Sequence, residues 1–338
     1  MPVTSRDIAR EIGLSQSTVS RALRGDPRVA PDTLARVQAA AERLAYVPDA
    51  VARSLTTGRT QTVAVVVADV TNPFYPEIVE VLHGELGRKG YATVLLNDPR
   101  GDDLVRLLRG RAVDGLIAVS ATLDERLRDQ LSRLGMPLVL LNRDLERLDA
   151  DRVVSDNVAG GALVAEHLLG LGHRRIGLIA GPANTSTARD RERGFRDALA
   201  ARGLPLDPAL RREGSFSHHS GHQGCLELLR LPEPPTAIFC ASDVVAFGAL
   251  DAAKRLGVAV PEQLSVVGYD DVAMAGWEAF ALTTIRQPLA QMAKLSVRLL
   301  LDRLQPSGGG EDPAASPPRR EVFPPQVVKR ETTAPPAG

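Results

Sequence analysis

The chain of 338 residues lacks the long apolar segment of a membrane helix, because no run of about 18 apolar residues occurs in it. Its first ten residues, MPVTSRDIAR, also lack the apolar core of a secretory signal. Only two cysteines are present, Cys225 and Cys240, and both lie in apolar segments, which favours buried thiols in a reducing compartment over a disulfide. Together these absences predict a cytoplasmic protein.

Motifs for common catalytic and cofactor chemistries are missing as well. The glycines of GLGHRRIG do not have the G-x-G-x-x-G spacing of a dinucleotide site, and neither a P-loop nor G-x-S-x-G occurs. His218 and His222 are one helical turn apart, but no glutamate lies between them, so the HExxH pattern fails and the start of a surface helix is favoured over a metal site. We therefore predict no cofactor, no metal and no enzymatic activity.

Charge is balanced over the whole chain, with 41 basic and 41 acidic residues, but not over its first 60 residues. That segment contains nine arginines, no lysine and six acidic residues. Arginine can bind phosphate through two parallel hydrogen bonds, so this modest excess points weakly to a nucleic acid.

Helical spacing predicts three short helices at the start of the chain. Thr4 can cap the first helix, and Ser15 can cap the second, in which Val19 and Leu23 share one face. A loop rich in glycine and proline precedes the third helix. The second helix carries four polar residues on the face opposite its apolar side: Gln16, Ser17, Ser20 and Arg21. Such a face is either simply solvated or built to contact another polar molecule.

After residue 61 the pattern changes to apolar runs that alternate with helical periods. The runs are TVAVVVADV, YATVLLN, GLIAVS, PLVLLN, RRIGLIAG, TAIFCAS and QLSVVGYDD. They are typical of strands buried on both faces of a parallel sheet, so the alternation predicts a doubly wound α/β fold with two lobes. The Gly/Pro/Ser-rich stretch 305–320 is predicted to be a disordered loop, and FPPQVVKRE after it a short edge strand.

The segment VTSRDIAREIGLSQSTVSRALRGDPRVAPDTLARVQAAAERLAYVPDAVARSL resembles the helix-turn-helix headpiece of the LacI/GalR family of transcriptional repressors. The pieces DVTNPFY, DGLI, LGHRRIGLIAGP, RERGF, ASDVVAFGAL, LSVVGYDD and TTIRQP resemble that family's effector-binding core, which is similar to periplasmic sugar-binding proteins. The resemblance implies an all-α headpiece at 1–46, a hinge helix and linker at 47–61, and a two-lobed α/β core at 62–338. Within this core, the resemblance implies a first lobe formed by residues of about 62–158 and 288–320. The second lobe is formed by residues of about 159–287 and 321–333.

The resemblance also implies that the second helix lies in the major groove of a palindromic operator, which the two headpieces of a homodimer bind. By motif position Gln16 and Ser17 read bases, and Arg21 also reaches the groove. The hinge helix inserts Leu55 into the minor groove, where Ala52 lets two hinge helices approach. The predicted DNA-binding residues are Thr4, Ser15, Gln16, Ser17, Thr18, Ser20, Arg21, Ala52 and Leu55.

Two residues depart from the family pattern. Asp49 stands where asparagine is common, and its carboxylate near phosphate would weaken the contact. Ala30 stands at the cap of the third helix, where serine is usual, and leaves Pro31 and Asp32 to satisfy the helix start. Both departures can lower the affinity for DNA.

Side chains that follow predicted strands define an expected effector site, because ligands of open α/β sheets bind beyond the carboxyl ends of the strands. Asp270 and Arg191 match ligand positions of the family, and Phe216 matches an aromatic stacking position. Asn142 and Ser242 stand where several sugar-responsive relatives have aspartate and asparagine, so a pentose, a hexose, a sugar phosphate or a nucleoside-like ligand all stay open, and no basic cluster argues for a phosphate. The predicted effector residues are Asp69, Asn72, Phe74, Tyr75, Ser120, Asn142, Arg191, Phe216, Ser242, Asp270 and Gln287.

The predicted function is that of a dimeric transcriptional regulator, a repressor, whose affinity for its operator is controlled by a sugar or sugar derivative. Two other classes explain less of the sequence. A transport binding protein would account for the core but has no use for residues 1–55, and an α/β enzyme would account for the lobes without a catalytic set of residues. The sequence leaves open whether the ligand releases the operator or promotes binding. The tail has no leucine heptads, so a tetramerising coiled coil is not expected.

Overall fold

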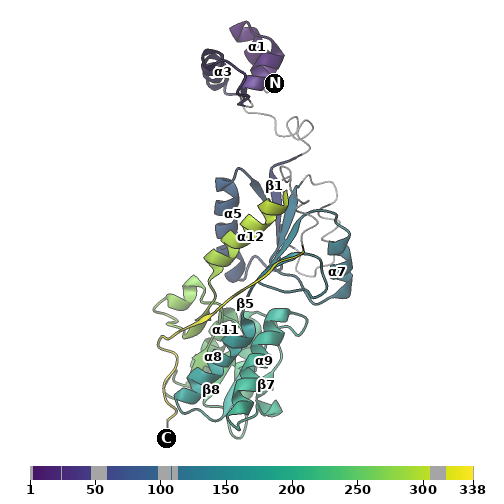
Figure 1. Ribbon diagram of the computed structural model, residues 1–338. Coiled ribbons are helices and arrows are strands. Elements are labelled where there is room, and N and C mark those ends of the chain that lie inside the picture. Colours follow the sequence, from purple (N-terminus) through teal and green to yellow (C-terminus); the bar gives the residue numbers. More distant parts are fainter. Residues whose placement is uncertain are drawn as a thin grey trace. The chain divides into compact units, whose positions relative to one another are not determined.

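The computed structural model describes residues 3–23, 25–46, 59–97, 108, 113–304 and 317–337. The chain divides into two compact units, residues 1–60 and residues 61–338, which are described one at a time (Figure 1). The hinge residues Asp49, Ala52 and Leu55 lie outside the described residues, as does most of the loop at 305–320.

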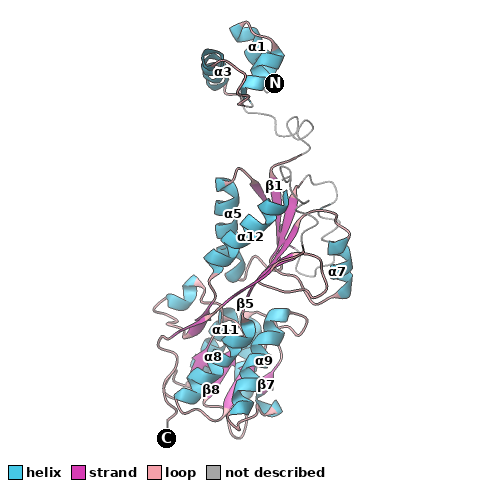
Figure 2. Ribbon diagram, in the orientation of Figure 1, coloured by secondary structure: helices cyan, strands magenta, loops and turns pink. Residues whose placement is uncertain are grey.

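The described residues of the first unit form three helices, α1 (Ser5–Ile12), α2 (Gln16–Leu23) and α3 (Pro31–Arg43) (Figure 2). Both predicted caps are confirmed. The backbone N–H of Thr4 donates to Asp7 Oδ2 over 2.9 Å, and Ser15 Oγ accepts from the backbone N–H of Thr18 over 3.1 Å. These bonds satisfy N–H groups that have no partner within their helices, and they explain why α1 and α2 begin where they do.

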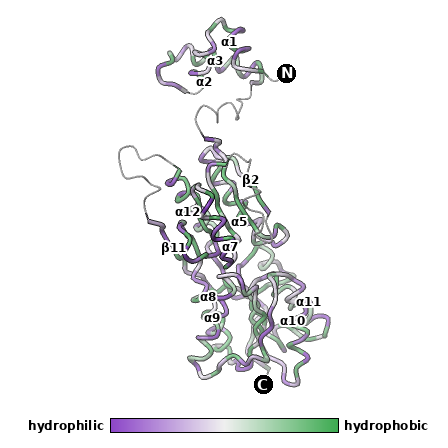
Figure 3. Tube along the Cα trace, turned by 90° about the vertical axis from the view of Figure 1, so that its right-hand side faces the viewer, coloured by the Kyte–Doolittle hydropathy of each residue, from purple (hydrophilic) through white to green (hydrophobic). Residues whose placement is uncertain are grey.

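A small apolar core holds the three helices of the first unit together. Each helix contributes one fully buried branched residue, namely Ile8, Val19 and Val37. Gly13 turns the chain between α1 and α2 at a φ of +67°, a conformation that a side chain would strain. Ala30 precedes α3 without a side-chain hydrogen bond, as its residue type dictates. Hydrophilic and hydrophobic positions alternate along the trace, as expected of so thin a core (Figure 3).

The second unit is built on two parallel sheets. The first has the order β11-β5-β4-β3-β1-β2, and the second has the order β7-β6-β8-β9. A third pair, β10 with β12, is antiparallel. The bounds of these strands are β1 (Thr62–Val67), β2 (Ala92–Asn97), β3 (Gly115–Ala118), β4 (Leu138–Leu141), β5 (Asp151–Ser155), β6 (Ile176–Ile179), β7 (Arg211–Arg212), β8 (Ala237–Cys240), β9 (Ser265–Val267), β10 (Thr284–Arg286), β11 (Arg320–Phe323) and β12 (Gln326–Val328).

Helices cover both faces of each sheet, so the predicted doubly wound α/β fold is confirmed. On the first sheet, α5 and α12 pack together over one face and α7 covers the other (Figure 1). On the second sheet, α8 and α9 cover one face and α10 and α11 the other (Figure 3). Their bounds, with two short 3-10 helices, are α5 (Phe74–Arg88), α7 (Glu125–Ser132), α8 (Asn157–Gly170), α9 (Ser186–Ala201), η1 (Pro208–Leu210), α10 (His218–Leu229), α11 (Asp243–Leu256), η2 (Ala273–Gly276) and α12 (Leu289–Leu304).

Strand periodicity explains how one sheet serves two layers of helices. Leu178 of β6 and Phe239 of β8 pack against α8 and α9, whereas their neighbours Ile179 and Cys240 pack against α10 and α11. Successive side chains of a strand point to opposite faces, so a run of apolar residues is needed when both faces are covered. The fully apolar sequences of β6 and β8 meet this requirement.

The crossovers near the C-terminus correct one predicted boundary. Residues 321–333 were expected in the second lobe, but β11 pairs in parallel with β5 and extends the first sheet. The chain returns to the second lobe only at β12, which pairs with β10 and forms the short final strand predicted from FPPQVVKRE. Pairing with β11 gives β5 the hydrogen-bond partners that an edge strand lacks. Within the described residues, no helix is both long and apolar enough to cross a membrane.

Candidate functional site

The polar face of α2 is accessible in the first unit. Gln16, Ser17 and Arg21 are exposed, whereas Val19 and Ala22 are buried against the other two helices. The remaining predicted residues of this face, Ser15, Thr18 and Ser20, are exposed or half-buried. The helix therefore presents hydrogen-bonding groups of one face to the solvent, as a helix that enters the major groove must.

Gln16 is held against α1 by two hydrogen bonds. Arg6 Nε donates to Gln16 Oε1 over 3.2 Å, and Gln16 Nε2 donates to Ser5 Oγ over 3.4 Å. Arg21 Nε donates to the Ser17 carbonyl over 3.4 Å. In the described part of the chain neither Arg6 nor Arg21 forms an ion pair, so both guanidinium charges stay available to an anionic partner.

A small cavity, of about 20 Å³, lies at the carboxyl ends of strands from both sheets of the second unit. Its lining comes from the loop after β1 and the first turn of α5, the loop after β4, α9, the loop before α10, and the loop after β9. The structure brings together seven of the predicted effector residues there: Asn72, Phe74, Tyr75, Asn142, Arg191, Phe216 and Asp270.

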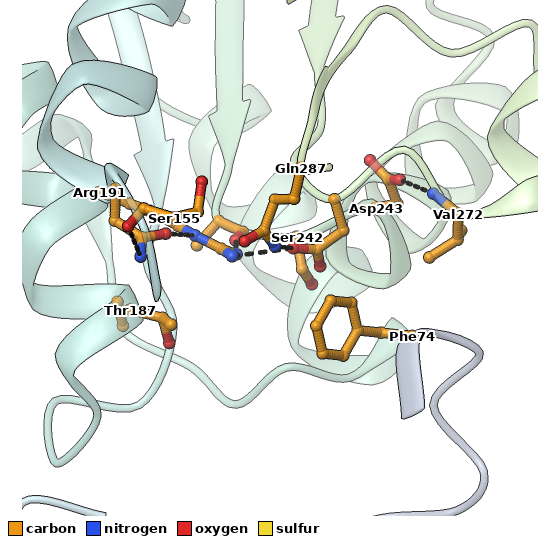
Figure 4. Close-up of polar contacts among 12 residues, drawn as sticks. Phe74, Ser155, Thr187, Arg191, Ser242, Asp243, Val272 and Gln287 are labelled. Atoms are coloured by element: carbon orange, nitrogen blue, oxygen red, sulfur yellow. Dashed lines mark hydrogen bonds and ion pairs between the residues drawn. The ribbon is translucent and has the colours of Figure 1, made fainter. Parts of the chain in front are cut away.

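Arg191 is the most constrained side chain of this cavity. Its Nε donates to Asn157 Oδ1 over 2.9 Å, its Nη1 to the Ala241 carbonyl over 2.6 Å, and its Nη2 to Asp270 Oδ1 over 2.8 Å. The guanidinium carbon lies 3.6 Å from the ring centroid of Tyr269, close enough for a cation–π contact. Figure 4 shows Arg191 extending from its helix toward Gln287. Each of the three guanidinium nitrogens thus donates one hydrogen bond within the protein.

Asp270 faces Arg191 from the loop after β9. Its Oδ1 accepts hydrogen bonds from Arg191 and from Gln287 Nε2, the latter over 2.8 Å. Burial raises the pKa of Asp270 above its usual range, although Arg191 and Gln287 oppose that shift by stabilising the charged form. The backbone of Asp270 has a φ of +117°, which is strained for a residue with a side chain. Asn142 also has a positive φ, at +71°, and strain of this kind concentrates at functional sites.

Phe216 supplies a half-buried aromatic wall between two arginines. The guanidinium carbons of Arg143 and Arg191 each lie 5.8 Å from its ring centroid. The side chain of Asn72, from the other lobe, donates to the Phe216 carbonyl over 3.4 Å. The cavity therefore combines a flat apolar surface with buried polar groups, the arrangement that recognises a small polar molecule.

Four predicted effector residues do not line the cavity. Asp69 is exposed and accepts two hydrogen bonds from Thr71, and Ser242 caps α11. Ser120 is buried and its carbonyl accepts from Arg143, while Gln287 acts through Asp270. These four residues bond to loops and helix ends around the cavity and do not line it.

Two lining residues, Arg143 and Thr187, were missed in the sequence. Arg143 directly follows Asn142, so the rule of looking beyond strand ends would have found it one residue further along. Thr187 lies one helical turn before Arg191 on α9 and shares its face. Asn157 and Tyr269, which contact the guanidinium of Arg191, were missed as well. Nothing in a linear sequence shows that these distant segments meet at one side chain.

The histidines of α10 do not assemble into a metal site. The helix begins at His218, as predicted, and His218 Nε2 lies 2.7 Å from Asp251 Oδ2. Among the described residues, no group of three or more His, Cys, Asp or Glu side chains is placed to hold a metal ion.

Comparisons with known proteins agree on both units. Residues 4–49 match the model of bacterial regulatory proteins of the lacI family, and residues 165–333 match that of the periplasmic binding protein-like domain. The chain is 34% identical over 307 residues to the HTH-type transcriptional repressor PurR of Photorhabdus laumondii, covering 89% of this chain and 90% of that protein. It is also 34% identical over 307 residues to the HTH-type transcriptional repressor CytR of Escherichia coli K12, with the same coverage.

Solved structures resemble most or nearly all of the chain. A complex of the transcriptional regulator CelR with cellobiose is 33% identical, has a TM-score of 0.73, and covers 98% of this chain and 99% of its own. The lac repressor dimer bound to operator and the anti-inducer ONPF is 29% identical, has a TM-score of 0.86, and covers 99% of this chain and 100% of its own. An Enterococcus faecium regulator of the same kind with bound ribose is 31% identical, has a TM-score of 0.72, and covers 81% of this chain and 99% of its own.

Proposed function

Since the chain belongs to the LacI family of bacterial regulatory proteins, and is therefore a DNA-binding transcriptional repressor and not an enzyme, we propose that it acts as a homodimer whose affinity for a palindromic operator is set by a carbohydrate bound in the cleft. The observation that carries this proposal is the buried polar cavity at the strand ends, in a chain that also presents the exposed polar face of α2.

Operator recognition is assigned to α2. Exposed Gln16 and Ser17 stand at the first turn of the helix, where residues of a recognition helix reach base edges. Arg21 lies one turn later on the same face and can contact a base or a phosphate. Fixing Gln16 against α1 lowers the side-chain entropy that is lost on binding, which favours a defined base contact.

Carbohydrate binding is assigned to the cavity of the second unit. Asp270 keeps a second carboxylate oxygen for which no hydrogen bond is recorded within the described residues, and Asn142 Oδ1 is buried without a partner. Both atoms can accept from neighbouring hydroxyls, while the ring of Phe216 can cover an apolar sugar face. The similar structures that hold cellobiose and ribose support a ligand of this class.

Contacts between the two lobes, across the cleft, are the basis on which the ligand would shift the protein between two states of different operator affinity. Besides the bond from Asn72 to the Phe216 carbonyl, the backbone N–H of Ala273 donates to Glu77 Oε1 over 2.8 Å, and the N–H of Asp144 donates to Ser186 Oγ over 2.8 Å. A ligand that binds both lobes favours one arrangement of these contacts over another. It changes operator affinity only by the difference between its own affinities for the two states.

Dimerisation is assigned to an apolar groove along α5 and β2. Its lining residues are Val67, Val70, Tyr75, Pro76, Val79, Glu80, His83 and Leu95. Val70 and Leu95 are 42% and 43% exposed, which is unusual for large apolar side chains that lie together. We assign the groove to a second copy of this chain, because two headpieces are required for the two halves of a palindrome.

The proposal is tested with an operator selected from a random DNA pool and a ligand found by thermal-shift screening of sugars. Fluorescence anisotropy should show that the ligand alters operator affinity of the wild-type protein. Arg191→Ala and Asp270→Ala should still bind operator but no longer respond, whereas Arg298→Ala, which removes an exposed charge from α12, should respond normally. A full response of the Arg191→Ala protein at the wild-type ligand concentration would place the effector site elsewhere.

A further inference from the structure

We propose that the effector carries a carboxylate, and that Arg143 binds it. The inference rests on the proposed function and deepens it, because it assigns a chemical class, a sugar acid, to the ligand of the same cavity. It follows from an imbalance between the two arginines that line this cavity.

Arg143 is a buried cation without a counter-ion. Its residue is only 5% exposed, yet within the described chain it takes part in no ion pair. Its Nη1 donates to the Ser120 carbonyl over 3.1 Å and its Nη2 to the Tyr75 hydroxyl over 2.9 Å, and both partners are neutral. Its Nε is buried and has no hydrogen-bond partner. A buried guanidinium of this kind has lost its hydrogen bonds to water, and the two neutral partners replace only part of their energy. This arrangement is unfavourable unless an anion binds the guanidinium.

Arg191 shows what a satisfied arginine looks like in the same cavity. It is 3% exposed, but it is paired with Asp270 and stacked on Tyr269. Among the residues that the structure describes, Asp270 is the only carboxylate that lines the cavity, and its interaction with Arg191 neutralises one of the two guanidinium charges. One positive charge remains, and it belongs to Arg143.

Two helices add to this positive potential. Phe74 and Thr187 line the cavity, and they lie in the first turns of α5 and α9, which have 15 and 16 residues. The aligned peptide dipoles of a helix place a partial positive charge of about half an elementary charge at its start. The cavity is therefore suited to one negative charge on its ligand, close to Arg143.

A carboxylate fits this site better than a phosphate monoester. It carries one negative charge, as many as the unpaired guanidinium can neutralise, whereas a phosphate monoester carries about 1.5 to 2 at pH 7. Its two oxygens also match the planar donors of arginine. The rest of the lining offers amide and hydroxyl groups, from Asn72, Asn142 and Thr187, and the ring of Phe216. These groups suit the polyhydroxylated body of a sugar acid.

The test compares sugar acids with their neutral counterparts by isothermal titration calorimetry on the full-length protein. The pairs are D-glucuronate with D-glucose, D-galacturonate with D-galactose, and D-gluconate with D-glucitol; D-glucose 6-phosphate provides the phosphate arm. We expect wild-type protein to bind at least one carboxylate roughly tenfold or more tightly than its neutral partner. Arg143→Gln should abolish that preference, and Arg298→Gln, a matched loss of one exposed arginine, should retain it.

The inference is overturned if no carboxylate binds wild-type protein more tightly than its neutral partner, if the phosphate binds more tightly than every carboxylate, or if Arg143→Gln keeps the full preference. The wild-type comparison alone can overturn it, so the result does not depend on a variant that folds. Arg143→Lys, which keeps the charge and loses the planar donors, should retain a reduced preference. A neutral sugar that releases the operator would overturn this inference and leave the proposed function intact, whereas cleft variants that respond normally would overturn the proposed function.

Discussion

Asp270 is pulled in two directions. Burial favours its neutral form, while the hydrogen bonds from Arg191 and Gln287 favour the carboxylate, and burial is the larger effect, so its pKa is raised. A carboxyl group whose pKa is higher in the folded than in the unfolded protein lowers the free energy of unfolding at any pH at which the group is ionised in both the folded and the unfolded state. This cost declines as the pH falls through the pKa of the folded state. The ionised form of Asp270 thus lowers the stability of the folded protein, but it provides an anionic hydrogen-bond acceptor in the cleft.

Stability and ligand affinity should therefore change in opposite directions at acid pH. As Asp270 takes up a proton, the ion pair with Arg191 is lost and we expect effector affinity to fall. Calorimetric titration at a series of pH values, from neutral down through the raised pKa, measures this fall. Asp270→Asn should bind more weakly and show a flatter profile. A variant with the same pH slope as wild type would assign the titration to another group.

Gln16 is the residue at which base specificity should be most sensitive. Its side chain is exposed but held by Arg6 and Ser5, which lie on or beside a different helix, so its position is fixed relative to α1. We expect Gln16→Ala to lose about 1–3 kcal/mol of discrimination at one base position of each half-site. Competition binding with single-base operator variants measures this loss. Gln38→Ala, the same change at an exposed position of α3, should leave discrimination unaltered, and equal losses in both variants would contradict the assignment.

Residue by residue, the sequence predicted positions better than roles. Counting to the end of a strand located Asn142 and Asp270, because the position follows from chain topology alone. Asp69 and Ser242 also follow strands but do not line the cavity, since a carboxylate or hydroxyl in this position can equally well bond to a local turn or cap a helix. The same rule, applied one residue further, would have located Arg143, but nothing in a sequence shows which arginines find a carboxylate when the chain folds.

At the scale of elements, the packing of α8 against α9 positions the cleft. Gly161 of α8 and Gly194 of α9 face each other's helices so closely that a Cβ on Gly161 would collide with the Arg191 carbonyl, and one on Gly194 with the Val158 carbonyl. Only glycine permits this approach between helices. The backbone of Arg191 is thus fixed by a helix contact that has no polar chemistry of its own.

We expect Gly161→Ala to disturb both stability and ligand response. The added methyl group has no space, so α9 must shift, and overpacking of this kind costs about 1–3 kcal/mol of unfolding free energy. The shift carries Arg191 with it and should weaken effector binding. Denaturant unfolding and ligand titration measure the two effects. Gly170→Ala lies on the same helix in open space and should be neutral or slightly stabilising. Equal effects of the two substitutions would show that packing at Gly161 is not the cause.

Most of the strands that could be located from the sequence consist of apolar residues buried in the sheet. The sequences of β1, β3, β4, β6 and β8 are almost uninterrupted apolar runs, and each was located from its run. By contrast, β5 was missed because it starts with Asp151 and Arg152. Asp151 is nevertheless 1% exposed, and it is paired with Arg303 and Arg319 from distant parts of the chain. A charged residue can be buried in a sheet when oppositely charged residues, distant in the sequence, neutralise its charge. The local sequence around the strand does not identify those residues.

At the scale of the whole molecule, the apolar groove decides whether two headpieces act together. Leu95 on β2 and Val322 on β11 are both 43% exposed, but they lie on strands at opposite edges of the first sheet, and only Leu95 lines the groove. We expect Leu95→Asp to shift the protein to monomers in analytical ultracentrifugation and to reduce its affinity for the palindrome toward that for a single half-site. Val322→Asp should stay dimeric. A dimeric Leu95→Asp protein would move the interface to another surface.

Thermodynamic linkage connects the two units and can be measured without a structure of either complex. If the effector changes operator affinity by some factor, the operator must change effector affinity by the same factor, because both follow from one coupling free energy. The fragment 61–338 contains the complete cavity and its own apolar cores, so it should bind effector with the affinity of the full chain free of DNA. We expect saturating operator to change the effector affinity of the full chain by the factor that the effector imposes on operator binding, and to leave the fragment unaffected. Calorimetry of effector binding with and without operator, set beside anisotropy of operator binding with and without effector, supplies the two factors. Unequal factors would mean that effector and operator are not linked through a single equilibrium between two states of the dimer. The proposal that contacts across the cleft couple the two binding sites would then be wrong.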